Sequence, residues 1–188
     1  HLIGRVEMET TRNVTITIHG LAEDNGLARA EVFLQKFKAL VNSLKIADVH
    51  LNGKKSHNII VTLLEISSAK AAVRETISVK NRVPEPSYPF VADALTAIYN
   101  GDRHIHRFPQ NLIKALGSLA KHDRNYAHAE IDFAGENVIR IDDYLDKQAQ
   151  RAIERLDGAF EEMDTQFEGI SFGSFDGVLK ELDYRGAL

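Results

Sequence analysis

The 188-residue sequence contains no cysteine. Disulfides, zinc–thiolate sites, iron–sulfur clusters and thiol nucleophiles are therefore excluded, and the composition fits a reducing compartment. No stretch approaches the roughly 18 apolar residues that a membrane-spanning helix needs, and the first residues lack the apolar core of a secretory signal. These absences lead us to expect a cytoplasmic protein with no membrane partner.

A strong excess of one charge is also missing, as is every common cofactor motif. The 23 Lys and Arg residues nearly balance 27 Asp and Glu residues, so bulk charge gives no attraction to nucleic acid. Phosphate-binding loops, dinucleotide-binding glycine patterns, H-E-x-x-H and calcium loops are absent. The segment "GISFG", residues 169–173, fits the G-x-S-x-G pattern of hydrolases. No histidine follows His128, so we interpret this segment as a glycine-rich turn, and we expect no cofactor.

Periodic patterns predict both strands and helices. Alternation and β-branched residues predict strands at 13–19, 59–66, 69–78, 126–133 and 137–141. Apolar spacing of three and four predicts helices at 27–44, 90–99, 109–121 and 143–157, with Asp142 as the cap of the last. Because strands and helices are segregated, we expect an α+β fold with a mostly antiparallel sheet packed by amphipathic helices.

The chain changes character after residue 160. Glycines at 169, 173 and 177 separate short apolar stretches, a pattern typical of bulged strands. We therefore predict an α+β domain over 1–160 and a C-terminal β segment over 161–188. This tail would pair with the main sheet or begin a second, truncated domain.

Three features resemble a family of uncharacterised bacterial proteins. They are the amphipathic helix, the hairpin "HNIIVTLLEISSAKAAVRE" at 57–75, and the segment "GSFDGVLKEL" at 173–182. The resemblance implies an α+β fold that continues into a small β-barrel. It implies no activity, because that family has none assigned.

The stretch "YAHAEIDFAGE", residues 126–136, alternates polar and apolar side chains. His128, Glu130 and Asp132 would share one side of a strand, about 6.5 to 7 Å apart by strand rise. Imidazole and carboxylate ligands suit Zn, Mn or Fe. The alternative interpretation is the solvated face of an antiparallel sheet.

A second histidine cluster occurs in "GDRHIHRF", residues 101–108, where Arg103 and Arg107 flank His104 and His106. The His-x-His pair could bind a metal, and the arginines could bind phosphate or carboxylate groups. A solvated connection between helices is the plainer interpretation.

These patterns favour a non-catalytic binding module whose partner is another protein or a second copy of the chain. The alternative is a metal-dependent enzyme that uses His128, Glu130 and Asp132 together with His104 or His106. A third hypothesis is nucleic-acid binding through Arg103, Arg107, Lys54 and Lys55.

Overall fold

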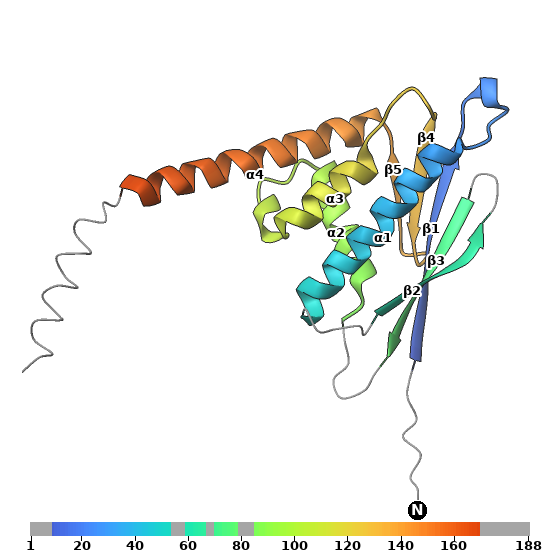
Figure 1. Ribbon diagram of the computed structural model, residues 1–188, viewed down its shortest axis with the longest axis horizontal. Coiled ribbons are helices and arrows are strands. Elements are labelled where there is room, and N and C mark those ends of the chain that lie inside the picture. Colours follow the sequence, from blue (N-terminus) through green and yellow to red (C-terminus); the bar gives the residue numbers. More distant parts are fainter. Residues whose placement is uncertain (1–8, 54–58, 67–69, 79–84, 170–188) are drawn as a thin grey trace, which may run out of the picture. The chain divides into compact units, whose positions relative to one another are not determined.

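The computed structural model describes residues 9–53, 59–66, 70–78 and 85–169 (Figure 1). Its strands are β1 (Glu9–His19), β2 (Ile59–Ile66), β3 (Lys70–Ser78), β4 (His128–Phe133) and β5 (Asn137–Ile141). Its helices are α1 (Ala30–Asn52), α2 (Ser87–Tyr99), α3 (Gln110–Ala120) and α4 (Asp143–Gly169). Two short 3₁₀ turns, η1 (Ala22–Asp24) and η2 (Ile105–Arg107), lie in the loops.

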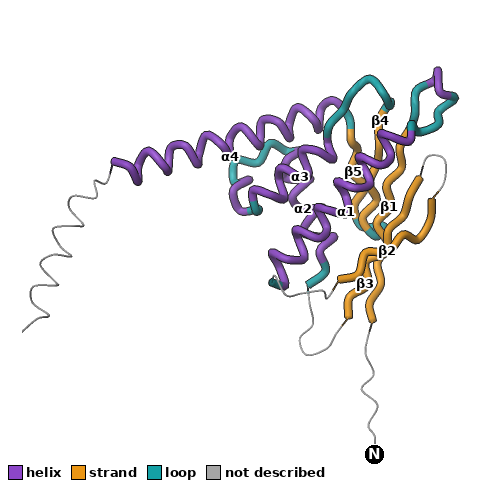
Figure 2. The backbone as a smooth tube through the Cα atoms, viewed as in Figure 1, coloured by secondary structure: helices purple, strands orange, loops and turns teal. Residues whose placement is uncertain are grey.

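The five strands form one sheet in the order β2-β3-β1-β4-β5. Every neighbouring pair is antiparallel, and β1 in the centre joins the β2–β3 hairpin to the β4–β5 hairpin. Figures 1 and 2 show α1, α2 and α3 on one side of this sheet. The expected α+β class with an antiparallel sheet is confirmed.

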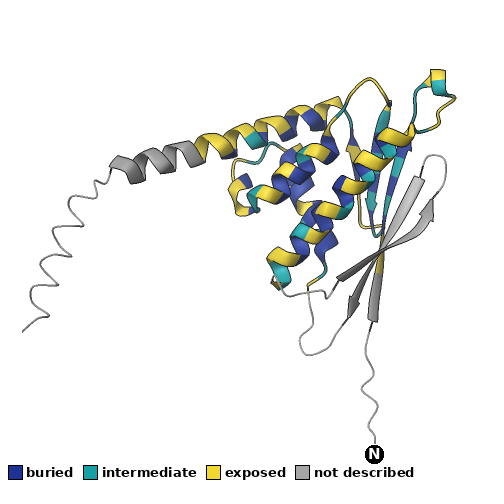
Figure 3. Cartoon of the chain, in the orientation of Figure 1, coloured by how far each residue is buried: buried dark blue, intermediate teal, exposed yellow. Residues whose placement is uncertain are grey.

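The core lies between the sheet and these helices (Figure 3). The alternation of each strand directs Val14, Ile16 and Ile18 of β1, and Ile131 and Phe133 of β4, into this layer, where they are buried. Each such side chain contributes about 1.5–3 kcal/mol through removal of apolar surface from water. The opposite face, which we call the open face, is the one that α1, α2 and α3 leave uncovered (Figure 1). In β1 and β4 it presents Thr15, Thr17, His19, His128, Glu130 and Asp132.

The predicted strand at 126–133 begins two residues late. Strand β4 starts at His128, and Tyr126 is only 2% exposed although alternation placed it on the polar face. Its hydroxyl donates a hydrogen bond to the Lys121 carbonyl at 2.7 Å. The expectation for Tyr126 was therefore wrong, because a local hydrogen bond turns the loop before the ladder begins.

The last helix is longer than its sequence pattern predicts. Asp142 caps it as expected, since its Oδ1 accepts the Leu145 backbone N–H at 3.1 Å, but the helix continues to Gly169. Residues 161–169 are thus helical, and the expectation of β structure was wrong there. The serine of "GISFG" and the "GSFDGVLKEL" segment lie outside the described residues.

The chain divides into two compact units, residues 1–153 and 154–188, so the division falls within α4 and before residue 160. Among the described helices, none combines the length and apolar character that crossing a bilayer requires.

Candidate functional site

Two histidines from different strands meet on the open face. His19 ends β1 and His128 begins β4, and the two residues lie opposite each other in the antiparallel register. Their rings stack, with centroids 4.3 Å apart and planes inclined by 16°. Glu130 Oε1 lies 3.7 Å from His128 Nε2. Within the described residues, these three form the one group of at least three candidate metal ligands, with ligand atoms within 4.8 Å of one another.

The surroundings of His128 disfavour its protonated form. Partial burial has the largest effect and lowers the pKa of His128, and the neighbouring His19 and Arg140 act in the same direction. Glu130 and Asp142 oppose this change less strongly. His128 is therefore held toward the neutral imidazole, which is the form that binds metals and accepts hydrogen bonds.

The predicted set of His128, Glu130 and Asp132 does not come together as a whole. Asp132 lies on the same face, but its Oδ1 accepts the Gly135 backbone N–H at 2.8 Å and so braces the β4–β5 turn. That turn needs this support because Ala134 and Gly135 both have positive φ, 57° and 75°. The third candidate ligand is His19 instead. Spacing along the sequence could not connect it to His128, because the two residues meet only through the pairing of β1 with β4.

The segment with Arg103, His104, His106 and Arg107 forms a separate, self-paired loop. Asp102 accepts hydrogen bonds from the Arg107 guanidinium at 2.5 Å and from the His104 backbone N–H at 2.8 Å. These bonds lower the pKa of Asp102. The rings of His104 and His106 contact each other at 5.9 Å. Neither histidine belongs to the His19–His128–Glu130 group, so the structure does not join them to the predicted metal set.

Arg107 is already engaged within this loop, both by Asp102 and by the Phe108 ring, 4.7 Å from its guanidinium carbon. It is thus a weaker anion ligand than the sequence suggests. Binding at Arg103, His104 and His106 stays a prediction. Lys54 and Lys55 of the nucleic-acid hypothesis lie outside the described residues.

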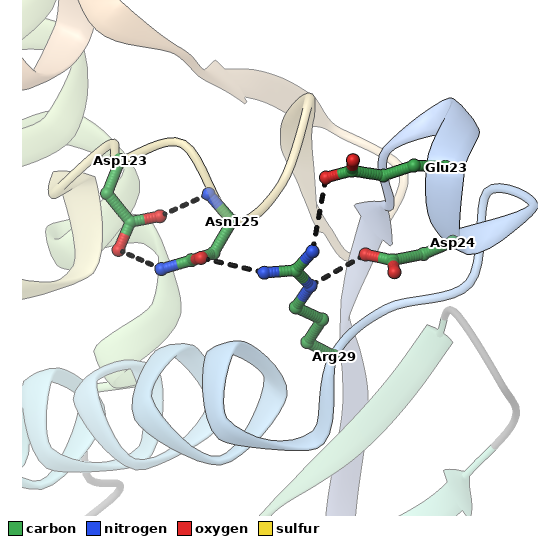
Figure 4. A network of polar contacts seen from close by, with 5 residues as sticks. All are labelled: Glu23, Asp24, Arg29, Asp123 and Asn125. Carbon is green, nitrogen blue, oxygen red and sulfur yellow. Dashed lines mark hydrogen bonds and ion pairs between the residues drawn. The ribbon is translucent and has the colours of Figure 1, made fainter.

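The loops that flank the two stacked histidines are tied together by one arginine (Figure 4). Arg29 contacts Glu23 at 3.2 Å and Asp24 at 2.7 Å in the loop after His19. It also donates to Asn125 at 2.9 Å in the loop before His128. Asn125 in turn holds Asp123 through its backbone and side-chain amides. Because both loops contact Arg29, this side chain links the end of β1 to the start of β4.

A buried lysine, Lys36, contacts the start of the loop that leads from α3 to β4. Lys36 of α1 is 1% exposed, and its Nζ donates to the carbonyls of Leu119, at 2.7 Å, and Lys121. The ammonium also lies 5.1 Å from the centre of the Tyr126 ring. Burial lowers the pKa of Lys36 to about 8. These contacts fasten the end of α3 to α1 and fix the approach to β4.

A second candidate region lies along the outer strand β5. Thr96 and Tyr99 of α2, with residues 137–140 of β5, line a groove of about 290 Å³, here called the edge groove. Val138 is 64% exposed and Tyr99 44% exposed. Tyr144, which is 49% exposed, extends this surface by an edge-on ring contact with Tyr99 at 5.0 Å.

Comparisons of the chain with protein-family models, with curated protein sequences and with solved structures found no match. The geometry of the described residues is therefore what indicates the function. That geometry offers two regions with different chemistry. The stacked histidines on the open face present ligands for a cation, and the edge groove presents apolar side chains beside β5, an outer strand of the sheet that the structure describes.

Proposed function

We propose that this chain is a non-catalytic protein-binding module, and that its partner adds an extended segment to the outer edge of β5. The partner is another protein or a second copy of the chain. The observation that carries the proposal is the coincidence of an outer strand with exposed aromatic and aliphatic side chains. Among the described strands, β5 is an end strand of the sheet and pairs only with β4.

The backbone of β5 is oriented for such pairing. Ala134 donates its N–H to the Asn13 carbonyl of β1 at 3.0 Å. The backbone N–H and C=O groups of successive residues in a strand point to opposite sides. Since the N–H of Ala134 points to β1, the backbone groups of the odd-numbered residues of β4 point to β5. Their partners in β5 are Asn137, Ile139 and Ile141, so the N–H and C=O groups of Val138 and Arg140 point to the open edge. An added strand would find hydrogen-bonding groups there.

The side chains along the edge suit a protein partner. Tyrosine and arginine are enriched among residues that dominate binding energy at protein interfaces. Here Tyr99, Tyr144 and Arg140 stand beside the exposed Val138. Tyr144 is held in place because its hydroxyl donates to the Tyr99 carbonyl at 3.1 Å. A prearranged aromatic surface loses little side-chain entropy when it is covered.

A photo-reactive amino acid at position 138 tests the proposal in cells that express the full chain. We expect it to crosslink one specific protein, or a second copy, through an extended segment of that partner. Position 34 supplies the matched control, because Leu34 on α1 is also 64% exposed but lies on no strand. Equal crosslinking at both positions, or none at 138, would contradict the proposal.

Proline at position 138 tests the backbone geometry. Val138→Pro removes an outward N–H, so it should preserve the fold and weaken partner binding at least about tenfold. Val138→Ala keeps the N–H and should bind more tightly than the proline variant. Hydrogen exchange provides the direct readout, since the amides of Val138 and Arg140 should exchange more slowly in the complex. Unchanged exchange at both amides would exclude strand addition.

A further inference from the structure

We propose that His19, His128 and Glu130 bind a divalent transition-metal ion of the Zn²⁺ class on the open face of the sheet. This inference does not depend on the edge groove, because none of the three residues lines it. The site also differs from the metal set that the sequence predicts, since it uses His19 in place of Asp132. Three side chains from two neighbouring strands supply two nitrogens and one carboxylate oxygen.

The spacing of the ligand atoms suits a small ion. Ligands held about 2.0–2.2 Å from a tetrahedral Zn²⁺ stand about 3.3–3.6 Å from one another. Here the separation between His128 Nε2 and Glu130 Oε1 is 3.7 Å, and all three ligand atoms lie within 4.8 Å. His19 is exposed, and His128 and Glu130 are half-buried, so the two stacked rings have room to rotate out of the stack and direct a nitrogen each toward one ion.

The backbone beneath the site belongs to the paired strands β1 and β4. His19 and His128 are paired across adjacent strands, and Glu130 is paired with Thr17 in the same ladder. The loops beyond them are joined through Arg29, which reaches Asp24 on one side and Asn125 on the other. Ligands placed on strands and braced by neighbouring contacts need little rearrangement to bind.

The donor set also indicates the class of ion. Imidazole with one carboxylate suits Zn²⁺ and its first-row neighbours, whereas Mg²⁺ and Ca²⁺ prefer sets of oxygen ligands. Three protein ligands leave at least one coordination position for water or another small ligand. The ion would thus join the central strand β1 to β4 at the end of their ladder and present an exchangeable position to solvent.

Calorimetric titration of the full, untagged chain with ZnCl₂, after removal of metal by EDTA and dialysis, tests the site. We expect one ion per chain, and His19→Ala and His128→Ala should each weaken the affinity at least about 100-fold, because each removes one of three ligands. Co²⁺ supplies a second readout, because coordination by these ligands should produce visible absorption bands that both variants lose.

The double variant His104→Ala, His106→Ala is the matched control, because these histidines form a pair elsewhere on the surface. Its Zn²⁺ affinity should equal that of the unchanged chain. Circular dichroism establishes that each variant folds, and His19→Ala decides the matter if His128→Ala does not fold. The inference is overturned if Zn²⁺ fails to bind at about 100 µM, or if it binds equally tightly to the His19→Ala variant. The partner-binding measurements at Val138 are independent of this result.

Discussion

Replacement of Gly20 by alanine is expected to lower the free energy of unfolding by about 2–4 kcal/mol, within the range of severe steric substitutions. A Cβ at this position would stand 1.9 Å from the carbonyl oxygen of Leu27 and 2.5 Å from its carbonyl carbon. The obstacle is backbone, which cannot rotate away. The Gly20 N–H also donates to the Gly26 carbonyl at 3.1 Å, so the whole loop after His19 would have to move.

Gly117→Ala is the matched control for this experiment. An added Cβ at Gly117 would also be close to a neighbour, 2.6 Å from Ile153 Cδ1, but that atom ends a side chain that can change rotamer. Alanine also favours the helical conformation of α3 by about 1 kcal/mol over glycine. Urea denaturation should therefore show little change or a small gain for Gly117→Ala. Similar losses in both variants would contradict the assignment of the Gly20 effect to backbone contact.

Lys36→Met is expected to lower the free energy of unfolding by about 1–3 kcal/mol at pH 7, because the Leu119 carbonyl loses its buried donor. Methionine keeps the length and apolar stem of the side chain, so the change isolates the amine. The Lys121 carbonyl is less affected, since the Tyr126 hydroxyl also donates to it. A loss of this size would establish that the buried amine stabilises the junction of α1 with α3.

The difference in free energy of unfolding between the unchanged protein and Lys36→Met should grow at alkaline pH. The pKa of Lys36 is about 8 in the folded chain and 10.5 for an ordinary lysine. Below pH 8 the amine is protonated in both states, so the desolvation cost of its charge, which the hydrogen bonds to the two carbonyls offset, does not change with pH. Between these two values the unfolded chain binds more protons, and the stability of the unchanged protein rises with pH. Relative to Lys36→Met, the gain should reach about 2 kcal/mol by pH 9.5.

Urea denaturation of both proteins at pH 7.0, 8.0, 9.0 and about 9.5 measures this gain, and the partial ionisation of ordinary tyrosines near pH 9.5 is common to both proteins and cancels in their difference. Burial raises the pKa of Tyr126, so its phenol stays neutral throughout this range. A difference in stability that stays constant or shrinks with rising pH would show that Lys36 does not have a lowered pKa. Neutral Lys36 keeps two N–H groups, so the bonds to the two carbonyls can persist after deprotonation.

The sequence predicts features that depend on periodic local patterns, and it misses features that depend on single specific contacts or on residues far apart in the chain. The helices and strands have periodic patterns, which depend on burial of one face, and each predicted element overlaps one in the structure. The bounds differ, since β1 begins at Glu9 rather than at residue 13 and α1 spans Ala30–Asn52 rather than 27–44. Tyr126 was placed on the wrong side because its hydrogen bond to Lys121 is specific and leaves no periodic signal. The end of α4 was missed because the glycines near residue 169 resemble strand interruptions as much as helix ends.

The candidate metal site was predicted only in part for a related reason. His128 and Glu130 are two residues apart in one strand, so alternation alone placed them on one face. Their contact with His19 depends on the pairing of β1 with β4, which no short-range pattern encodes. A histidine at the polar end of a predicted strand was the available signal. Asp132 fitted the same alternation, but its role in the adjacent turn removed it from the group.

The central position of β1 has a consequence for the order of events during synthesis. β1 is completed 109 residues before its partner β4 begins, since His19 pairs with His128. At about 5–20 residues per second, a ribosome needs roughly 5–20 seconds to make the intervening chain. Of its two described neighbours, only β3 is made during this interval, so the edge of β1 that will pair with β4 stays open to association with other nascent chains. The sheet is therefore completed when β1 pairs with β4, a contact between residues far apart in the chain, and the stacked histidines come together only at that step.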